Sequence, residues 1–567
     1  MSNAPPIVSF RRISPIREAP GQDPRLNNLG FRAGRAMTAS VPVCCNGFGS
    51  NKAVGIGQWK LREGLPSGNL GRMSAVAVAA PNVASAEAGE AVARLGGNAI
   101  DAALAAALVT MVNEVGIVSL SSGGFITVQP PDGSAPQTVD GWVEMPGRDR
   151  ELGGGTWDIT TSYGGGVIVT IGPGSVGTHG SLAAIGEAHA RWGRVPWREI
   201  VEPALDLAKS GFRLSATSRY YLDYVHEDIF GWDEASDRAI HGGDGAIRDD
   251  LLVIGDLADS FAEIAEEGTS AMYTGDLGHR ISDAVVDAGG ILGRGDLAAY
   301  RARVRPALVT RVGTWTLGTN PPPSVGGVCV AAMMRLMEDR PRGAWSQADL
   351  EHLISVQRAV LGQRLAVFDH TDDLERDAAD YLALIDRSHL AVLESGSTAH
   401  VSATDSDGGA CSITVSSGYS SGMIAERTGI WLNNSLGEPE LNPHGLHGLE
   451  PGTRLLSNMA PTVGRRDDGA VLAIGSPGAD RITTAIIQAL AGFVNGDMSL
   501  KEAIEHPRIH VHRAGTEGEE IKVEEELSMY FGGVAAALRE ADGRMIAAAD
   551  PRRDGAVRIG VSPHAVD

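Results

Sequence analysis

The sequence feature that most constrains the fold is a predicted β-hairpin centred on Asp407-Gly408-Gly409. Polar and apolar residues partly alternate on both sides of this turn, from Thr398 through Ser412-Ile413-Thr414, which is typical of two antiparallel strands joined by a tight loop. Small residues, Ser395-Gly396-Ser397, precede the first strand. The hairpin therefore predicts a β-rich second part of the chain, with Thr398 at the front of a strand.

Thr398 is the candidate catalytic nucleophile in this hairpin. If the chain cuts itself between Ser397 and Thr398, the new N-terminal threonine can use its own α-amine as the base for its own hydroxyl. An α-amine has a pKa of about 8, roughly two units below that of lysine, so it is a workable base near neutral pH. A threonine at the start of a strand is more often only a strand residue, so this hypothesis needs support from the rest of the chain.

The hairpin is one of an ordered series of motifs. In chain order the others are Gly96-Gly97-Asn98-Ala99-Ile100-Asp101-Ala102-Ala103, Ser121-Ser122-Gly123-Gly124-Phe125, Glu144-Met145-Pro146, Asn320-Pro321-Pro322-Pro323-Ser324 with Gly326-Gly327, Leu432-Asn433-Asn434, Met459-Ala460-Pro461-Thr462, Gly475-Ser476-Pro477-Gly478, His506-Pro507-Arg508 and Asp550-Pro551-Arg552. The series, with the Thr-x-His hairpin in its place, resembles the signatures of the gamma-glutamyltransferase family of N-terminal-nucleophile hydrolases. The resemblance covers roughly residues 74–560, and its specificity lies in the order of the motifs.

This resemblance implies a fold class and a domain organisation. The fold would be of the α/β (α+β) class, as a four-layer αββα sandwich. Residues 73–397 would form the large α subunit and residues 398–567 the small β subunit after self-cleavage, both in one intertwined catalytic domain. The mature protein would be an αβ heterodimer from one precursor, or a dimer of such heterodimers. Residues 1–72 lie outside the resemblance and are predicted to be an irregular extension.

Hydrophobic patterns and turn residues predict the individual elements. Helices are expected at residues 84–95, 100–112, 181–192, 197–210, 331–337, 350–367 and 482–493, and residues 214–285 are mostly helical by pattern. Strands are expected at residues 75–79, 126–129, 138–143 and 308–317, and the chain is β-rich from Thr398 to about residue 474.

The resemblance also implies catalytic roles. Thr398 matches the nucleophile, which attacks an amide carbonyl to give an acyl-enzyme. The acyl group is then transferred to water or to an amine. Ser416 matches a hydroxyl residue that bonds the threonine amine. Gly478 and Ala479 match the backbone pair of the oxyanion hole, where the family usually has two glycines. Alanine keeps the N–H donor, so the change is tolerable if its backbone angles are ordinary. His400 is interpreted as a structural histidine, because the α-amine already supplies the base.

The positions that would bind the acyl group depart from the family. Val143 stands where the family has the arginine that binds the glutamyl α-carboxylate, and valine cannot replace its bidentate contact. A Ser-Ser pair that helps to bind this carboxylate corresponds to Ser457-Asn458. The positions that hold the α-amine correspond to Gly418, Ser435 and, on a looser alignment, Glu438. Losing several charged contacts costs a few kcal/mol each, which argues against ordinary glutathione chemistry.

Three hypotheses follow. The favoured one is a self-processing amidohydrolase or acyltransferase that acts on a gamma-glutamyl-like or other small acyl amide, with a non-standard acyl group and a less polar pocket near Val143. The second is an authentic gamma-glutamyl enzyme (glutathione hydrolase) in which Arg148 and Glu438 have taken over the binding of the glutamyl group. The third is a catalytically silent scaffold that folds without cleaving.

Composition excludes several other classes. The net charge of −22 argues against a nucleic-acid partner, which requires a basic footprint, and no apolar run is long enough to span a membrane. Four cysteines at irregular spacing indicate free thiols rather than a disulfide framework. No cofactor is expected. No metal site is expected either, since His444 and His447 lie among loop-forming residues and His506, His510 and His512 lack obvious carboxylate companions. The first residues do not resemble a secretory signal, so a cytoplasmic location is predicted, with a periplasmic or secreted one if the true start differs.

Overall fold

The computed structural model describes residues 73–150, 153–161, 167–337, 345–385, 398–512, 516 and 518–565. Its centre is a seven-stranded antiparallel sheet in the order β19-β1-β9-β10-β2-β3-β6. The strands are β1 (Met73–Ala80), β2 (Gly123–Gln129), β3 (Gln137–Gly141), β6 (Arg303–Pro306), β9 (Ala399–Asp405), β10 (Ala410–Ser416) and β19 (Ala556–Ala565). The predicted hairpin is confirmed, because β9 and β10 pair antiparallel from Ala410↔Thr404 to Val415↔Ala399.

A second, six-stranded sheet has the order β18-β17-β14-β13-β8-β7. Its strands are β7 (Leu308–Val312), β8 (Trp315–Thr319), β13 (Thr462–Arg466), β14 (Val471–Gly475), β17 (Ala535–Arg539) and β18 (Met545–Ala549). The single strand predicted at residues 308–317 was wrong: a turn at Gly313, with φ +56°, divides it into the hairpin β7–β8. Both sheets combine strands from before and after residue 398.

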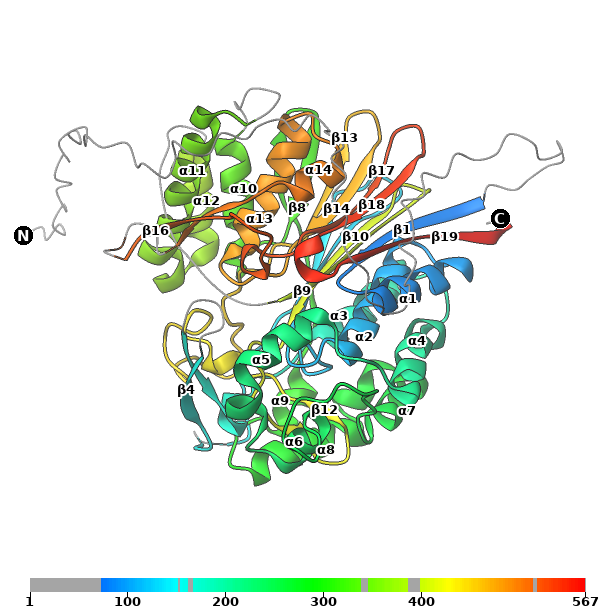
Figure 1. The fold of residues 1–567 in the computed structure, drawn as a ribbon, viewed down its shortest axis with the longest axis vertical. Helices are drawn as coiled ribbons and strands as arrows, with labels where there is room; N and C mark the ends of the chain where they lie inside the picture. Colours follow the sequence, from blue (N-terminus) through cyan, green and yellow to red (C-terminus); the bar gives the residue numbers. More distant parts are fainter. Residues whose placement is uncertain are drawn as a thin grey trace, which may run out of the picture.

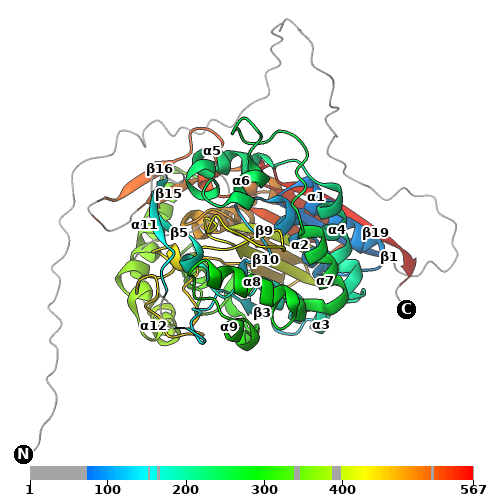
Figure 2. The same ribbon diagram turned by 90° about the horizontal axis from the view of Figure 1, so that it is seen from below.

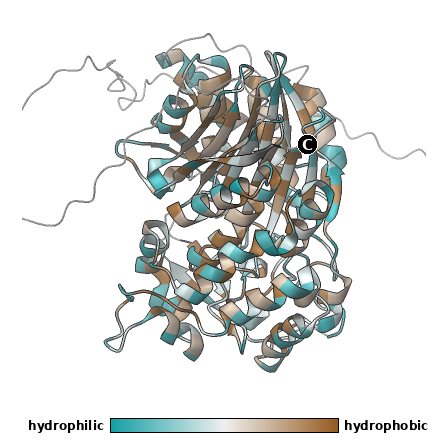
Figure 3. Ribbon diagram, turned by 90° about the vertical axis from the view of Figure 1, so that its right-hand side faces the viewer, coloured by the Kyte–Doolittle hydropathy of each residue, from teal (hydrophilic) through white to brown (hydrophobic). Residues whose placement is uncertain are grey.

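The two sheets pack face to face (Figure 1). Small side chains allow this close approach, and hydroxyls bond across it: Ser412 Oγ donates to the carbonyl of Ile474 at 3.0 Å and Ser402 Oγ to that of Ala535 at 3.1 Å. A small apolar cluster lies in the same interface, formed by Ala410, Val463, Val471 and Ala473. Figure 3 shows the strands of both sheets mostly in the brown and white of apolar and neutral residues.

Helices pack against both sheets. Those against the seven-stranded sheet are α1 (Val83–Arg94), α2 (Ala99–Asn113) and α3 (Ser181–Trp192); those against the six-stranded sheet include α10 (Val325–Leu336) and α13 (Arg481–Leu490), with α11 (Gln347–Ala366) and α12 (Leu374–Ile385) behind α10. Asn98 caps α2 in a capping box with Asp101, and a Cβ on Gly89 would lie 2.9 Å from the carbonyl oxygen of Ala102. Small residues therefore set the α1–α2 spacing, and the mixed α/β class is confirmed.

The helix α14 (Leu500–Glu505) packs against β18 and α13, and the other described α-helices lie beyond one end of the strands (Figures 1 and 2). They are α4 (Trp197–Ser210), α5 (Ala216–Phe230), α6 (Glu234–Ile240), α7 (Leu257–Glu267), α8 (Asp276–Asp287) and α9 (Arg294–Ala299). The predicted bounds of α3 and α4 match the observed ones, whereas α10 begins six residues earlier than predicted. No helix in the described ranges has the length and apolar character needed to cross a bilayer.

Candidate active site

Thr398 immediately precedes β9 and is buried, with 2% of its surface exposed. The β9–β10 register, which pairs Ala399 with Val415, places Ser416 opposite Thr398. Ser416 is the last residue of β10, and its Oγ accepts a hydrogen bond from the backbone N–H of Gly418 at 3.0 Å. The two residues predicted as nucleophile and amine partner therefore lie at the same end of two paired strands.

A network of small polar residues fixes this end of the strands. Ser417 Oγ lies 2.7 Å from Ser122 Oγ and 3.2 Å from Ser119 Oγ. The side-chain amide of Asn433 donates to the carbonyls of Ser121 and Gly177, at 2.9 Å each. The Ser121-Ser122 and Leu432-Asn433 motifs, to which the sequence analysis gave no role, thus hold the loops beside Ser416.

The predicted oxyanion residues, Gly478 and Ala479, lie in the turn between β14 and α13. Gly478 has φ +130°, and its carbonyl accepts from the N–H of Arg481 at 2.9 Å. Ala479 has φ +67°, so the condition under which alanine was judged tolerable here, ordinary backbone angles, is not met. A side chain in the left-handed region costs roughly 1–2 kcal/mol, and such strain often marks functional turns. The turn also leads into the N-terminus of a ten-residue helix, whose dipole favours negative charge.

His400 lies in β9, bonds Thr414 of β10 and packs against Gly475 of β14. Its ring nitrogens lie 2.8 Å from Thr414 Oγ1 and 2.8 Å from Ser402 Oγ, and burial lowers its pKa to about 3. A Cβ on Gly475 would lie 2.3 Å from His400 Cε1, so only glycine fits beneath the ring. A neutral imidazole with a hydrogen bond at each ring nitrogen agrees with the structural role predicted for His400.

Val143 forms an apolar wall near Ser416. It is fully buried, and a Cβ on Gly123, the β2 partner of Ser416, would lie 2.6 Å from Val143 Cγ2. Its carbonyl accepts from the N–H of Leu455 at 3.1 Å, which brings the segment leading to Ser457-Asn458 alongside. Val143, which was predicted to replace a carboxylate-binding arginine, therefore lies close to Ser416 and carries no charge.

Arg148 is held by other acidic groups. Its guanidinium nitrogens lie 3.5 Å from Glu144 Oε2 and 3.5 Å from Asp296 Oδ1. Glu144 also pairs with Arg454, which lies over the ring of Tyr300 with a Cζ-to-centroid distance of 4.5 Å. The structure thus places Arg148 in an ion-pair network around Glu144.

Glu438 is a buried carboxyl group that lacks hydrogen-bond partners. It is fully buried, and neither carboxyl oxygen has a hydrogen-bond partner. Burial, with a smaller contribution from the charge of Glu440, raises its pKa well above the usual range. A Cβ on Gly418 would lie 2.5 Å from Glu438 Oε1, so glycine at 418 leaves the room that this carboxyl occupies. Because the N–H of Gly418 bonds Ser416 Oγ, Gly418 connects Glu438 to the end of β10 that faces Thr398.

Two more of the predicted binding residues carry unpartnered polar atoms. Ser435 Oγ and both side-chain amide atoms of Asn458 are buried without a hydrogen-bond partner. Ser457 differs, since its Oγ accepts from the N–H of Met459 at 3.2 Å and its carbonyl accepts from Ser324 Oγ at 3.2 Å. Such orphaned groups are costly in a folded protein unless something else satisfies them, and a polar ligand would do so.

The comparisons with known proteins decide the family. A model of gamma-glutamyltranspeptidase matches residues 85–560, most of the chain. The chain belongs to the gamma-glutamyltranspeptidase family. Glutathione hydrolase proenzyme of Bacillus subtilis (strain 168) is 27% identical over 489 residues, covering 78% of this chain and 81% of the relative. Acylase ACY 1 proenzyme of Pseudomonas sp. (strain V22) is 27% identical over 459 residues, covering 76% and 81%.

Solved structures share the fold of this gamma-glutamyltranspeptidase family member. The structure of cephalosporin acylase from Bacillus halodurans superposes with a TM-score of 0.70 at 19% identity, covering 89% of this chain and 99% of that one. The family and its named relatives make this chain an enzyme of the amidohydrolase and transferase type.

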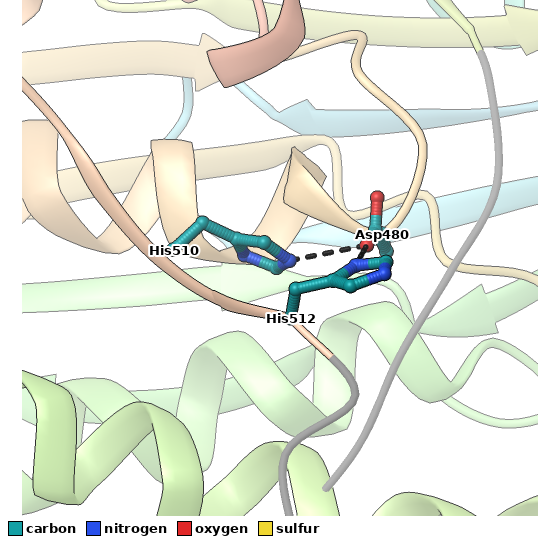
Figure 4. A group of neighbouring side chains, drawn as sticks. All are labelled: Asp480, His510 and His512. Atoms are coloured by element: carbon teal, nitrogen blue, oxygen red, sulfur yellow. Dashed lines mark hydrogen bonds and ion pairs between the residues drawn. The ribbon is translucent and has the colours of Figure 1, made fainter. Parts of the chain in front are cut away.

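One further group of side chains in this family member lies beside the turn at Gly478-Ala479. Asp480, which follows Ala479, has His510 Nε2 at 3.1 Å and His512 Nδ1 at 3.5 Å from its Oδ2 (Figure 4). The expectation that these histidines lack a carboxylate companion was wrong. Asp480 is 30 residues away from His510 in sequence. The sequence indicated only that His510 and His512, two positions apart in a strand, would lie on the same face of that strand.

Proposed function

We propose that this protein is a self-processing N-terminal-threonine amidohydrolase or acyltransferase. Cleavage of the Ser397–Thr398 bond would free the α-amine of Thr398, beside a buried hydroxyl opposite Ser416. The proposal is supported by the burial of Thr398, the β9–β10 register and the family to which the chain belongs. Relatives named as proenzymes add to this support.

The reaction would proceed in two steps. Thr398 Oγ1 forms a bond to the amide carbon while its proton passes to the α-amine, and the C–N bond then breaks as the amine leaves with that proton. Water or an acceptor amine attacks the resulting ester and regenerates the threonine. The backbone N–H groups of Gly478 and Ala479 would stabilise the oxyanion, a contribution typically worth about 3–4 kcal/mol per donor.

The acyl group is inferred from the contrast between Val143 and Glu438. With valine in place of the arginine, and Arg148 engaged by Glu144 and Asp296, a free α-carboxylate would lack a cationic partner. The buried Glu438 carboxyl, in contrast, has both oxygens open to a donor. We infer that the preferred acyl group carries an amino group and an apolar body, and no α-carboxylate. The unpaired Glu438 carboxyl is the observation that carries this inference.

The first experiment tests self-processing. Purified protein is run on a denaturing gel, with intact mass and N-terminal sequencing of any small fragment. Two fragments, the smaller beginning at Thr398, would support the proposal. A chain that stays uncut after long incubation would overturn it and favour the silent scaffold.

A matched set of anilides tests the acyl group. The set contains γ-glutamyl anilide, 4-aminobutyryl anilide without the α-carboxylate, glutaryl anilide without the amine, and butyryl anilide without either. The expected order of kcat/KM places 4-aminobutyryl first and glutaryl last, because glutaryl would bring a carboxylate to Glu438. Efficient turnover of γ-glutamyl anilide or glutathione would overturn the non-standard acyl group.

The same set addresses the authentic gamma-glutamyl alternative. That alternative is supported by the correspondence, on a loose alignment, of Glu438 with a position that binds the α-amine in the family. It requires Arg148 to leave Glu144 and Asp296 and bind the carboxylate. An Arg148→Ala variant that loses γ-glutamyl activity while keeping 4-aminobutyryl activity would support this alternative, and equal retention of both would count against it.

A further inference from the structure

The group formed by Asp480, His510 and His512 (the Asp–His–His cluster) consists of three metal-ligating side chains from two elements. His510 and His512 belong to β15 (Ile509–His512), where positions two apart share a face, and Asp480 immediately precedes α13. Figure 4 shows both imidazole rings directed at the Asp480 carboxylate. One ligand atom from each residue lies within 4.8 Å of the others.

The spacing of these atoms matches a tetrahedral ion. Zinc binds histidine nitrogen and carboxylate oxygen at about 2.0–2.2 Å, which makes the edge of the ligand tetrahedron roughly 3.3–3.5 Å. Asp480 Oδ2 lies 3.1 Å from His510 Nε2 and 3.5 Å from His512 Nδ1, so two of the three edges are already close to this length. Two imidazoles with one carboxylate suit Zn²⁺, Co²⁺ or Ni²⁺ better than Mg²⁺ or Ca²⁺, which prefer oxygen ligands.

The groups behind the ligands fit the same interpretation. His510 is completely buried, and its Nδ1 lies 3.1 Å from Thr484 Oγ1, a contact that orients the ring and leaves Nε2 facing Asp480. The other carboxylate oxygen of Asp480 bonds Arg481, whose Nε donates to the carbonyl of Tyr530 at 2.8 Å. His512 is 25% exposed, which gives an ion and a completing water a route from solvent.

We propose that the Asp–His–His cluster is a site for a divalent transition-metal ion of the zinc class. The ion would be bound by Asp480 Oδ2, His510 Nε2 and His512 Nδ1, with water in the fourth position, and His510 and His512 would bind in their neutral forms. The positive charge of Arg481 beside Asp480 weakens the site relative to a closed four-ligand centre. The ion would tie β15 to the first residue after the oxyanion turn. This site does not depend on the identity of the nucleophile or the acyl group.

The test measures metal binding directly. Protein freed of metal by chelator dialysis is titrated with Co²⁺, whose visible absorption reports four-coordination, and with Zn²⁺ followed by elemental analysis after desalting. His512→Ala is the main variant because its side chain is part-exposed, and His510→Ala is the second. His444→Ala, at an exposed histidine outside the cluster, is the matched control. The Thr398→Ala chain is titrated as well, to separate metal binding from processing.

Wild type, His444→Ala and Thr398→Ala are expected to bind one equivalent with the four-coordinate Co²⁺ spectrum. Each cluster variant should weaken binding by more than about tenfold. Absence of stoichiometric binding to wild type would overturn the proposal, as would binding that both cluster variants retain. Circular dichroism of each variant establishes that a loss of binding is not a loss of fold.

Discussion

Two neighbouring regions differ in how their polar side chains are satisfied. The first is the end of the β9–β10 hairpin, and the second is the group of buried side chains around Glu438. Around the hairpin, the hydroxyls and imidazole of Ser402, Ser412, Ser416 and His400 have partners within the fold. In the second region, Glu438, Ser435 and Asn458 have buried polar atoms without hydrogen-bond partners. The polar groups of the first region are thus satisfied within the fold, whereas those of the second remain available to a bound polar molecule.

The largest expected effect comes from Thr398→Ala, which removes the hydroxyl at the centre of the first region. We expect no cleavage at residue 398 and a fall in amide turnover of roughly 10⁴-fold or more, as for loss of a nucleophile elsewhere. Gel mobility, intact mass and anilide turnover measure both effects. Thr404→Ala is the control, because Thr404 lies in the same strand, is buried and has an unpartnered hydroxyl. Cleavage in Thr398→Ala would remove the basis of the nucleophile assignment.

The second prediction separates the two regions. Glu438→Gln should leave processing intact and lower kcat/KM for 4-aminobutyryl anilide by roughly 100-fold, about 2.7 kcal/mol, because a charged contact is lost. Butyryl anilide should be nearly unaffected, since it brings no amine. Glu450→Gln, at an exposed carboxylate in the following loop, is the control. An equal loss for both substrates would mean that Glu438 supports the fold rather than the amine.

The third prediction concerns pH. Because burial raises the pKa of Glu438 well above its usual value, the carboxyl is protonated in the empty site at mildly acidic pH. A cationic amine binds the ionised form, so KM for 4-aminobutyryl anilide should fall as pH rises, by at most tenfold per unit, until the pKa of Glu438 is passed. Butyryl anilide should show no such change in KM, and Glu438→Gln should abolish it. A pH dependence shared by both anilides would place the titrating group elsewhere.

The free energy of unfolding depends on the ionisation of Glu438 in the opposite direction to substrate binding. The folded pKa of Glu438 lies above the usual value of 4.5, so its protonated form favours the folded state below that value. This contribution disappears as pH rises through the folded pKa. Bound amine would reverse the trend, because the ion pair is present only at the higher pH.

Local patterns were sufficient for much of the fold. The bounds of α3 and α4, and the β9–β10 hairpin, follow from periodicity and from the Asp-Gly-Gly turn. The start of α10 was missed because glycines at 326 and 327 do not favour a helix. The structure explains them: a Cβ on Gly326 would lie 1.9 Å from the carbonyl oxygen of Asn458, and one on Gly327 at 1.9 Å from that of Asn320. This tertiary contact overrides propensity and is invisible to a pattern.

The site was predictable only where a motif carried it. Thr398, Ser416 and Gly478 were assigned through motifs and stay predictions, and Glu438, assigned on a loose alignment, lies next to Gly418 in the structure. Asp480 was missed because its partners, His510 and His512, come from a strand that only the folded chain brings alongside. The left-handed Ala479 was missed because no residue pattern shows a backbone angle.

The smallest expected effect tests the strain at the oxyanion turn. Ala479→Gly should raise stability by about 0.5–1 kcal/mol, because relief of the left-handed alanine exceeds the entropy that glycine loses on folding. The comparison is best made in the Thr398→Ala chain, so that both proteins are uncut. Thermal and urea unfolding midpoints measure the change.

Ala485→Gly supplies the opposite expectation. Ala485 is buried within α13, where glycine should lower stability by about 1 kcal/mol. If both substitutions destabilise, Ala479 is held without strain, and its methyl group, rather than the fold alone, contributes packing to the turn. If they differ in sign as expected, the turn at Gly478-Ala479 stores strain, and it is formed at a cost in stability, as are the unpaired polar groups around Glu438.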